Sequence, residues 1–160
     1  MTTCPRCGAS GRAVAAETVA ALVVSDRMDE IVDAQGGPAG WRLCSGPGCE
    51  VVYFAAGEAV VLADVVAVPF HKSRDPARLV CFCFGHSVAA VEADARAHGG
   101  SKIQAAIKAE CRAGHDDCER KSPHGRCCLG HVGQVVKDAL GADGDASDDD
   151  PEGCCGPSSR

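Results

Sequence analysis

A chain of 160 residues that is 46% hydrophobic but only 4% aromatic can form one domain or two small ones, with a core built mainly from alanine and valine. Its net charge of −6, without a basic segment, excludes a protein that binds nucleic acid through the phosphates. No apolar run approaches the roughly 18 residues of a membrane span, so we expect no stable membrane insertion.

The N-terminus bears on the state of the twelve cysteines. MTTCPRCGAS has no cationic start followed by an apolar stretch, and Cys4 would lie inside any signal peptide proposed there. We therefore expect a cytoplasmic protein. In a reducing compartment, clustered cysteines are more often metal ligands or redox thiols than disulfides.

Residues 1–76 are predicted to form a small β-rich domain. The valine-rich runs VAALVV, EVVYFA and AVVLADVVAV are interpreted as strands, and the clusters QGGPAG and SGPG between them as turns. The segment HKSRDPAR, which begins at His71, is polar and contains proline, which predicts a linker to the next domain.

Four cysteines of this first domain have the spacing of zinc knuckles. They occur as CPRCG and CSGPGCE, two turns that would supply four thiolates to one tetrahedral zinc ion: Cys4, Cys7, Cys44 and Cys49. The alternatives are a disulfide pair or metal-free buried thiols. Four protein ligands leave no position for a catalytic water, so the site is predicted to be structural. Three aromatic residues are expected to pack around it: Trp41, Tyr53 and Phe54.

Residues 77–141 are predicted to form a small helical domain. One helix is expected over 87–98 with Ser87 as its cap, a second from Ser101, and a third over 129–140 that ends at Gly141. The third helix would bury one stripe of apolar residues, Val132, Val135, Val136 and Leu140.

A second group of cysteines lies in this helical domain: Cys81, Cys83, Cys118, Cys127 and Cys128. Four thiolates with this spacing suit a two-iron, two-sulfide cluster, in which each iron takes two sulfur ligands. Zinc is the competing interpretation. A Rieske-like arrangement with two histidines from His86, His115 and His124 is a further alternative, and Cys111 is interpreted as a buried thiol of the second helix.

Residues 142–160 are predicted to form a disordered acidic tail that ends in Cys154-Cys155. Adjacent thiols on a flexible tether can capture soft ions such as Cu(I), Hg(II) or As(III). The alternative is that these two cysteines are incidental.

The two cysteine groups together resemble a known family. CFCFGHSVAAVEAD and CERKSPHGRCCLGHVGQVV resemble the iron-sulfur domain of CopZ-type copper metallochaperones, and their C-x-C, helix-helix, Cys-helix plan is similar to that of bacterioferritin-associated ferredoxins. CPRCG and CSGPGCEVVYF are similar to the CopZ-type N-terminal domain, so the resemblance covers about residues 1–140. It implies zinc at Cys4, Cys7, Cys44 and Cys49, and a [2Fe-2S] cluster at Cys81, Cys83, Cys118 and Cys128, with Cys127 as the alternative fourth ligand.

The resemblance implies a function in soft-metal handling. The chain lacks the M-x-C-x-x-C loop of the full-length CopZ-type proteins, so we expect no copper transfer through such a loop. We expect a metallochaperone-like α+β protein that handles copper, or alternatively mercury, with the cluster as a one-electron centre. Its partners would be a metal transporter, a metal-resistance protein or a reductase. No nucleophile, phosphate-loop or dinucleotide motif indicates an enzyme.

Two other functions remain open at this stage. One is an electron-transfer ferredoxin that docks on a reductase or a metal-storage protein and carries no cargo. The other is an interaction module with two zinc sites and no iron.

Overall fold

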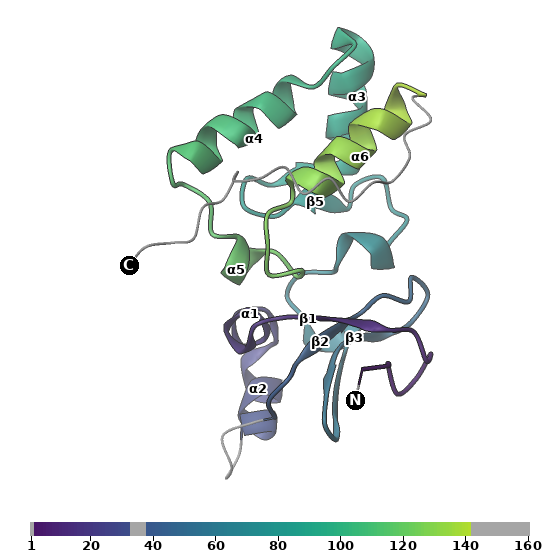
Figure 1. Cartoon of the computed structure of the whole chain (residues 1–160), viewed down its shortest axis with the longest axis vertical. Helices are drawn as coiled ribbons and strands as arrows, with labels where there is room; N and C mark the ends of the chain where they lie inside the picture. Colours follow the sequence, from purple (N-terminus) through teal and green to yellow (C-terminus); the bar gives the residue numbers. More distant parts are fainter. Residues whose placement is uncertain (1, 33–37, 142–160) are drawn as a thin grey trace. The chain divides into compact units, whose positions relative to one another are not determined.

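The computed structural model describes residues 2–32 and 38–141, which divide into two compact units (Figure 1). Unit 1 comprises the chain up to Arg74 together with Glu119–Arg126, and unit 2 comprises Asp75–Cys118 and the chain from Cys127 onward. The predicted tail at 142–160, with Cys154 and Cys155, lies outside the described residues.

A four-stranded antiparallel sheet forms the centre of unit 1. The strands β1 (Gly11–Ala13), β2 (Arg42–Cys44), β3 (Val51–Ala55) and β4 (Glu58–Val61) follow one another in the order β1-β2-β3-β4. All five residues of β3 are buried, in keeping with its unbroken apolar sequence VVYFA and its position between two neighbouring strands. The N-terminal part is therefore β-rich, as predicted.

Two helices pack against this sheet, and one of them replaces a predicted strand. The helices are α1 (Ala16–Leu22) and α2 (Ser25–Val32). The interpretation of VAALVV as a strand was wrong. The run begins inside AETVAAL, whose alanines and glutamate favour helix, and only Val23 and Val24 leave the helix, with Val23 bridging to Val65. Val19, Val23 and Ile31 pack with the sheet residues Leu43, Val52 and Tyr53 in one core cluster.

The chain after β4 is less regular than predicted. The run AVVLADVVAV is strand only to Val61, and it continues as the 3-10 helix η1 (Leu62–Asp64), where the Asp64 side chain accepts a hydrogen bond from the Val61 N–H at 3.2 Å. A second 3-10 helix, η2 (Phe70–Lys72), occupies the start of the predicted linker. Lys72 is buried there, so the first residues of HKSRDPAR are packed and not loose.

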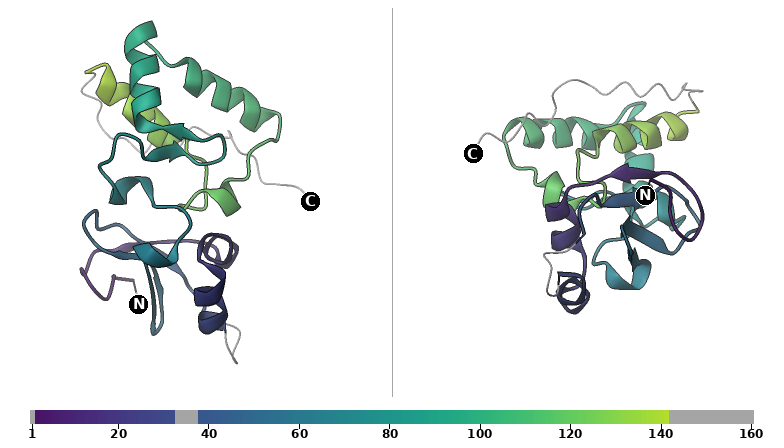
Figure 2. Two further views of the ribbon diagram at one scale, coloured as in Figure 1. Left: turned by 180° about the vertical axis from the view of Figure 1, so that it is seen from behind. Right: turned by 60° about the horizontal axis from the view of Figure 1, so that its bottom comes forward.

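Unit 2 is mainly helical (Figures 1 and 2). A short hairpin, β5 (Leu79–Cys81) and β6 (His86–Ser87), leads into α3 (Val88–His98), α4 (Lys102–Arg112) and, further along the chain, α6 (Leu129–Ala139). The short helix α5 (Cys118–Lys121) begins at Cys118 in unit 2, and its other three residues belong to unit 1. The predicted caps are confirmed, because the Ser87 and Ser101 hydroxyls accept hydrogen bonds from the N–H groups of Ala90 and Gln104.

The predicted stripe of the last helix is confirmed with one exception. Val132, Val135 and Val136 are buried, but Leu140 is 43% exposed because α6 ends one residue before it. Gly141 follows with φ of +66°, the left-handed conformation that closes many helices. None of the helices in the described ranges is long and apolar enough to cross a membrane.

Candidate metal centre

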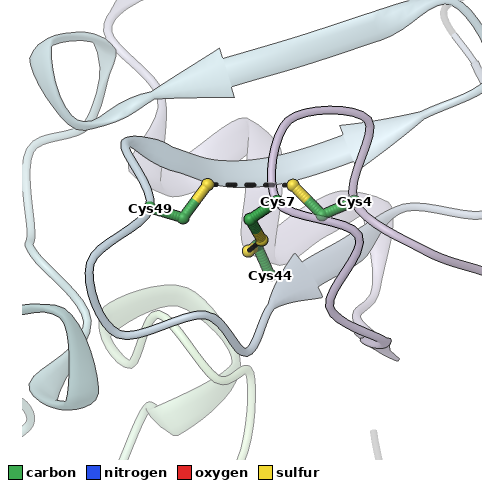
Figure 3. Close-up of side chains that lie close together, drawn as sticks. All are labelled: Cys4, Cys7, Cys44 and Cys49. Atoms are coloured by element: carbon green, nitrogen blue, oxygen red, sulfur yellow. Dashed lines mark hydrogen bonds between the residues drawn. The ribbon is translucent and has the colours of Figure 1, made fainter.

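The first candidate centre begins with a tight turn at Cys4 and Cys7. The Gly8 N–H donates to the Cys4 carbonyl at 2.9 Å, and the Cys4 N–H donates to the Ala9 carbonyl at 2.8 Å. Gly8 has φ of +71°, which favours glycine and lets the chain reverse. The turn places both sulfurs of CPRCG on one side of the loop (Figure 3).

A second turn, between β2 and β3, carries Cys44 and Cys49. The Cys49 N–H donates to the Gly46 carbonyl at 3.3 Å, and the Gly46 N–H donates to the Cys44 sulfur at 3.4 Å. A Cβ atom on Gly46 would lie 2.9 Å from the Cys7 sulfur, too close for any side chain without a shift. Glycine at position 46 therefore lets the two turns approach each other.

The four sulfurs have the spacing of a tetrahedral zinc site. They lie within 4.8 Å of one another, with Cys4 Sγ 3.8 Å from Cys49 Sγ and Cys7 Sγ 3.6 Å from Cys44 Sγ (Figure 3). Zinc–sulfur bonds of about 2.3 Å give tetrahedral sulfur–sulfur edges of about 3.8 Å. Three of the cysteines are buried and Cys7 is exposed. The described residues hold one group of metal-binding side chains this compact, and its donors fit zinc.

The protonation of these thiols also favours a cation. Burial would raise the pKa of Cys4, but the backbone N–H groups of Cys7 and Arg6 donate to its sulfur and bring the pKa down to about 7. Burial raises the pKa of Cys44 to about 12 and also raises that of Cys49. Without metal, the site therefore favours a thiolate at Cys4 and thiols at Cys44 and Cys49, and a bound divalent cation would favour the deprotonation of all three.

The packing around the four cysteines differs in part from the prediction. Phe54 packs with Val51 and three of the cysteines, and so it shields the site on one side. Trp41 and Tyr53 belong to the other core cluster of unit 1, so the prediction that they surround the site was wrong. Residues alternate faces along a strand, which places the neighbours Tyr53 and Phe54 in different clusters.

Two residues that hold the second turn were missed by the sequence analysis. The His71 Nε2–H donates to the Cys44 carbonyl at 2.8 Å, and burial lowers the pKa of His71. The Lys72 ammonium donates to the Gly46 carbonyl at 2.8 Å and the Cys49 carbonyl at 3.1 Å. Both lie on η2, far along the chain from the turn, and no spacing pattern connects them with it.

The second group of cysteines gathers in unit 2. Cys81 ends β5, Cys83 lies in the hairpin turn, and Cys118 begins α5. Cys83 Sγ is 3.3 Å from Cys118 Sγ and accepts a hydrogen bond from the Asp117 N–H at 3.4 Å. Cys127 contacts Cys118, and Cys128, the residue before α6, contacts Cys81. The contacts therefore join each cysteine of the C-x-C pair to one further along the chain.

Hydrogen bonds between these thiols shift their pKa values in opposite directions. The Cys128 S–H donates to the Cys81 sulfur, which lowers the pKa of Cys81 and raises that of Cys128. The pKa of Cys118 is raised by its hydrogen bonds to Cys127 and Cys83 and by burial. Soft sulfur donors of this number fit an iron-sulfur cluster in their chemistry.

The remaining candidates are one cysteine and three histidines. Cys111 is buried on α4, as predicted for a helix thiol. His115 is exposed and its Nδ1 lies 2.6 Å from a carboxylate oxygen of Glu110. His124 belongs to unit 1, where its ring packs against His71. His86 is half-buried on β6, where it is paired with Cys81 of β5.

Comparison with known proteins bears on the four-cysteine group first. Residues 1–67 match the family model zf_CopZ, described as a zinc binding domain. This part of the chain is similar to a zinc binding domain. Its four cysteines at 4, 7, 44 and 49 fall within the matched range, whereas the second cysteine group begins beyond it, at Cys81.

A solved structure resembles more of the chain. The X-ray structure of the N-terminal domain of CopZ from Archaeoglobus fulgidus has a TM-score of 0.65 and 25% sequence identity, and it covers 83% of this chain and 96% of that one. No curated protein matches significantly.

Proposed function

We propose that the protein is a cytoplasmic metallochaperone-like protein that binds structural zinc and a [2Fe-2S] cluster and handles soft metal ions. The zinc ligands are Cys4, Cys7, Cys44 and Cys49, and the cluster ligands are Cys81, Cys83, Cys118 and Cys128, with Cys127 as the alternative fourth ligand. The observation that carries the proposal is that five cysteines of unit 2 form a second group of neighbouring thiols, separate from the four-cysteine group of unit 1.

The role of zinc follows from the chemistry of its four donors. A closed set of thiolates binds zinc tightly and leaves no position for a substrate or a water. A sheet with short strands and few aromatic residues buries little apolar surface, so metal binding supplies much of its folding free energy. The zinc is therefore structural in this account.

The residues around the second group suit a negatively charged cluster. The Asp117 N–H already donates to the Cys83 sulfur, and Cys128 stands at the N-terminus of α6, where the helix dipole favours negative charge. These two features would offset part of the negative charge of a cluster bound there, whereas in the metal-free protein the Cys128 thiol keeps its proton and donates it to the Cys81 sulfur. A cluster bound there supplies a one-electron redox couple.

The cargo is proposed to be a soft cation, copper in the first place and mercury in the second. Support comes from the CopZ name of the similar structure and from the two adjacent thiols Cys154 and Cys155 in the sequence. We propose that the protein's partner is a metal transporter, a metal-resistance protein or a reductase, and that the protein is not itself an enzyme. An electron-transfer ferredoxin would use the same cluster without cargo.

Substitution of single cysteines tests the cluster ligands. The variants Cys128→Ser and Cys127→Ser are purified without oxygen and compared by visible absorption and by iron and zinc content. We expect Cys128→Ser to lose the cluster and Cys127→Ser to keep it, with zinc retained in both. If only Cys127→Ser lost the cluster, Cys127 and not Cys128 would be the fourth ligand. If the unsubstituted protein contained no iron, the proposal of a cluster would be wrong.

The cargo is tested separately. The double variant Cys154→Ser/Cys155→Ser is titrated with Cu(I) in competition with a chromogenic chelator. We expect it to lose a Cu(I) equivalent that the unsubstituted protein binds, with an unchanged cluster spectrum. Equal Cu(I) binding by the two proteins would remove the tail from the account, and no binding by either would favour the ferredoxin.

A further inference from the structure

The segment between two of the proposed cluster ligands is built into the zinc-binding unit. Glu119–Arg126, here called the strap, belongs to unit 1, whereas Cys118 before it and Cys127 after it belong to unit 2. The centre of the strap is well packed, because Ser122, Pro123 and His124 are all buried. A surface loop that only joined two helices would have no reason to bury these residues.

The centre of the strap accepts a hydrogen bond from the sheet. The Tyr53 hydroxyl donates to the Pro123 carbonyl at 2.8 Å, and both groups are fully buried. Burial raises the pKa of Tyr53, so its hydroxyl stays protonated and remains a donor. Tyr53 lies on β3, which begins two residues after the zinc ligand Cys49.

A second contact joins the strap to the zinc-binding turn itself. The ring of His124 packs against the ring of His71 with 5.4 Å between centroids, and the His71 Nε2–H donates to the carbonyl of Cys44. The path from zinc ligand to strap therefore passes through one side chain. The Cys44 turn and His124 therefore contact the same side chain, that of His71.

A third contact fixes the turn at the end of the strap. Gly125 has φ of +65°, and its N–H donates to the Ser122 carbonyl at 2.8 Å. A Cβ atom there would lie 2.7 Å from the Thr18 hydroxyl, on α1. The chain therefore passes close against α1 at this point, which glycine alone permits.

We propose that Tyr53 is a positioning residue for the second metal centre: through the strap, the zinc-binding unit fixes the chain on both sides of Glu119–Arg126, and so restrains Cys118, Cys127 and Cys128. This inference rests on the proposed function for the assignment of these cysteines as ligands. A strap held at its centre leaves short, restrained segments at each end, so less conformational entropy is lost when the ligands bind. Zinc binding and cluster binding then favour each other, because such coupling is reciprocal.

Limited proteolysis tests the anchoring on the full chain loaded with zinc alone. The strap offers trypsin three exposed cleavage sites, after Arg120, Lys121 and Arg126, which become susceptible only when the strap detaches. We expect Tyr53→Phe to retain zinc and to be cleaved in the strap roughly tenfold faster, because the buried Pro123 carbonyl loses its donor.

Two controls separate detachment from general instability. Ser45→Ala removes another hydroxyl that donates to a carbonyl of unit 1, that of Ser10, and should leave strap cleavage unchanged. Arg27, on α2, reports unfolding of unit 1, so its cleavage should not rise with that of the strap. Equal strap cleavage in Tyr53→Phe and the unsubstituted protein, or a parallel rise at Arg27, would overturn the inference.

The link to the second centre is tested by iron release. After cluster reconstitution, we expect Tyr53→Phe to lose iron to a chelator several-fold faster than the unsubstituted protein and Ser45→Ala, at equal zinc content. Equal rates would show that the strap does not restrain the ligands. If the unsubstituted protein takes up no iron, the proposed function fails, and the trypsin result still decides whether the zinc-binding unit holds the strap.

Discussion

Gly46 shows how far one residue can control the zinc site. Its missing side chain makes room for the Cys7 sulfur, so Gly46→Ala forces the two turns apart. Overpacking of this kind costs about 1–3 kcal/mol, which corresponds to a loss of zinc affinity of roughly five- to 150-fold. Competition with a chromogenic zinc chelator measures it.

Gly48→Ala is the matched control for this variant. Gly48 lies in the same turn, and a Cβ atom there would meet nothing within 4 Å. We expect it to bind zinc as the unsubstituted protein does. Equal affinities for the two variants would contradict the packing of the two turns described above.

The thiol pKa values predict how zinc affinity depends on pH. In the metal-free protein, the pKa of Cys44 is raised to about 12 and that of Cys4 lies at about 7. A thiol that must lose its proton to bind changes the affinity by about tenfold per pH unit below its pKa. Zinc affinity should therefore rise with pH between 7 and 8.5 by more than tenfold per unit, as measured by competition titration, and a pH-independent affinity would contradict a thiolate site.

At the scale of elements, local signals predicted the helices well. Ser87 and Ser101 cap α3 and α4, and the valine stripe of α6 is buried, because caps and periodicity act within a few residues. The strand predicted for VAALVV failed because a short apolar run fits a buried helix as well as a strand. The cysteine spacing, like the helix caps, is a local signal: each pair of cysteines lies within one turn, and so the sequence predicted the four-cysteine group.

Asp94 makes a testable contribution to the corner between α3 and α4. Its carboxylate accepts hydrogen bonds from the Ser101 hydroxyl at 2.9 Å and the Ile103 N–H at 3.0 Å, and these bonds, the Ile103 one first, lower its pKa. A carboxyl with a lowered pKa stabilises the fold above its ordinary value of 3.8, and this contribution is lost as the pH falls below that value.

The expected result is a lower melting temperature for Asp94→Asn at pH 7 and a difference that shrinks as the pH falls below 3.8. Circular dichroism at 222 nm follows the helices. Asp138→Asn, where the carboxylate accepts one exposed hydrogen bond from Gln134, is the matched control and should change little. A difference for Asp94→Asn that persists unchanged at low pH would contradict the role of its charge.

At the scale of the whole molecule, the long-range contacts were beyond sequence reasoning. Tyr53 meets Pro123 and His71 meets Cys44 across long stretches of chain, and no periodicity or spacing connects such pairs. The sequence HKSRDPAR carried the composition of a linker, and its first residues hold the zinc-binding turn only because the fold brings them there. Sequence reasoning therefore found the four-cysteine group and missed the side chains that position its second turn.

The most direct test of the account is the metal and acid-labile sulfide content of the full chain purified without oxygen. The account predicts about one zinc, two irons and two sulfides per chain, with the visible spectrum of an oxidised cluster. A chain that holds zinc at both cysteine groups and takes up no iron after reconstitution would contradict it, and would leave a zinc-stabilised binding module.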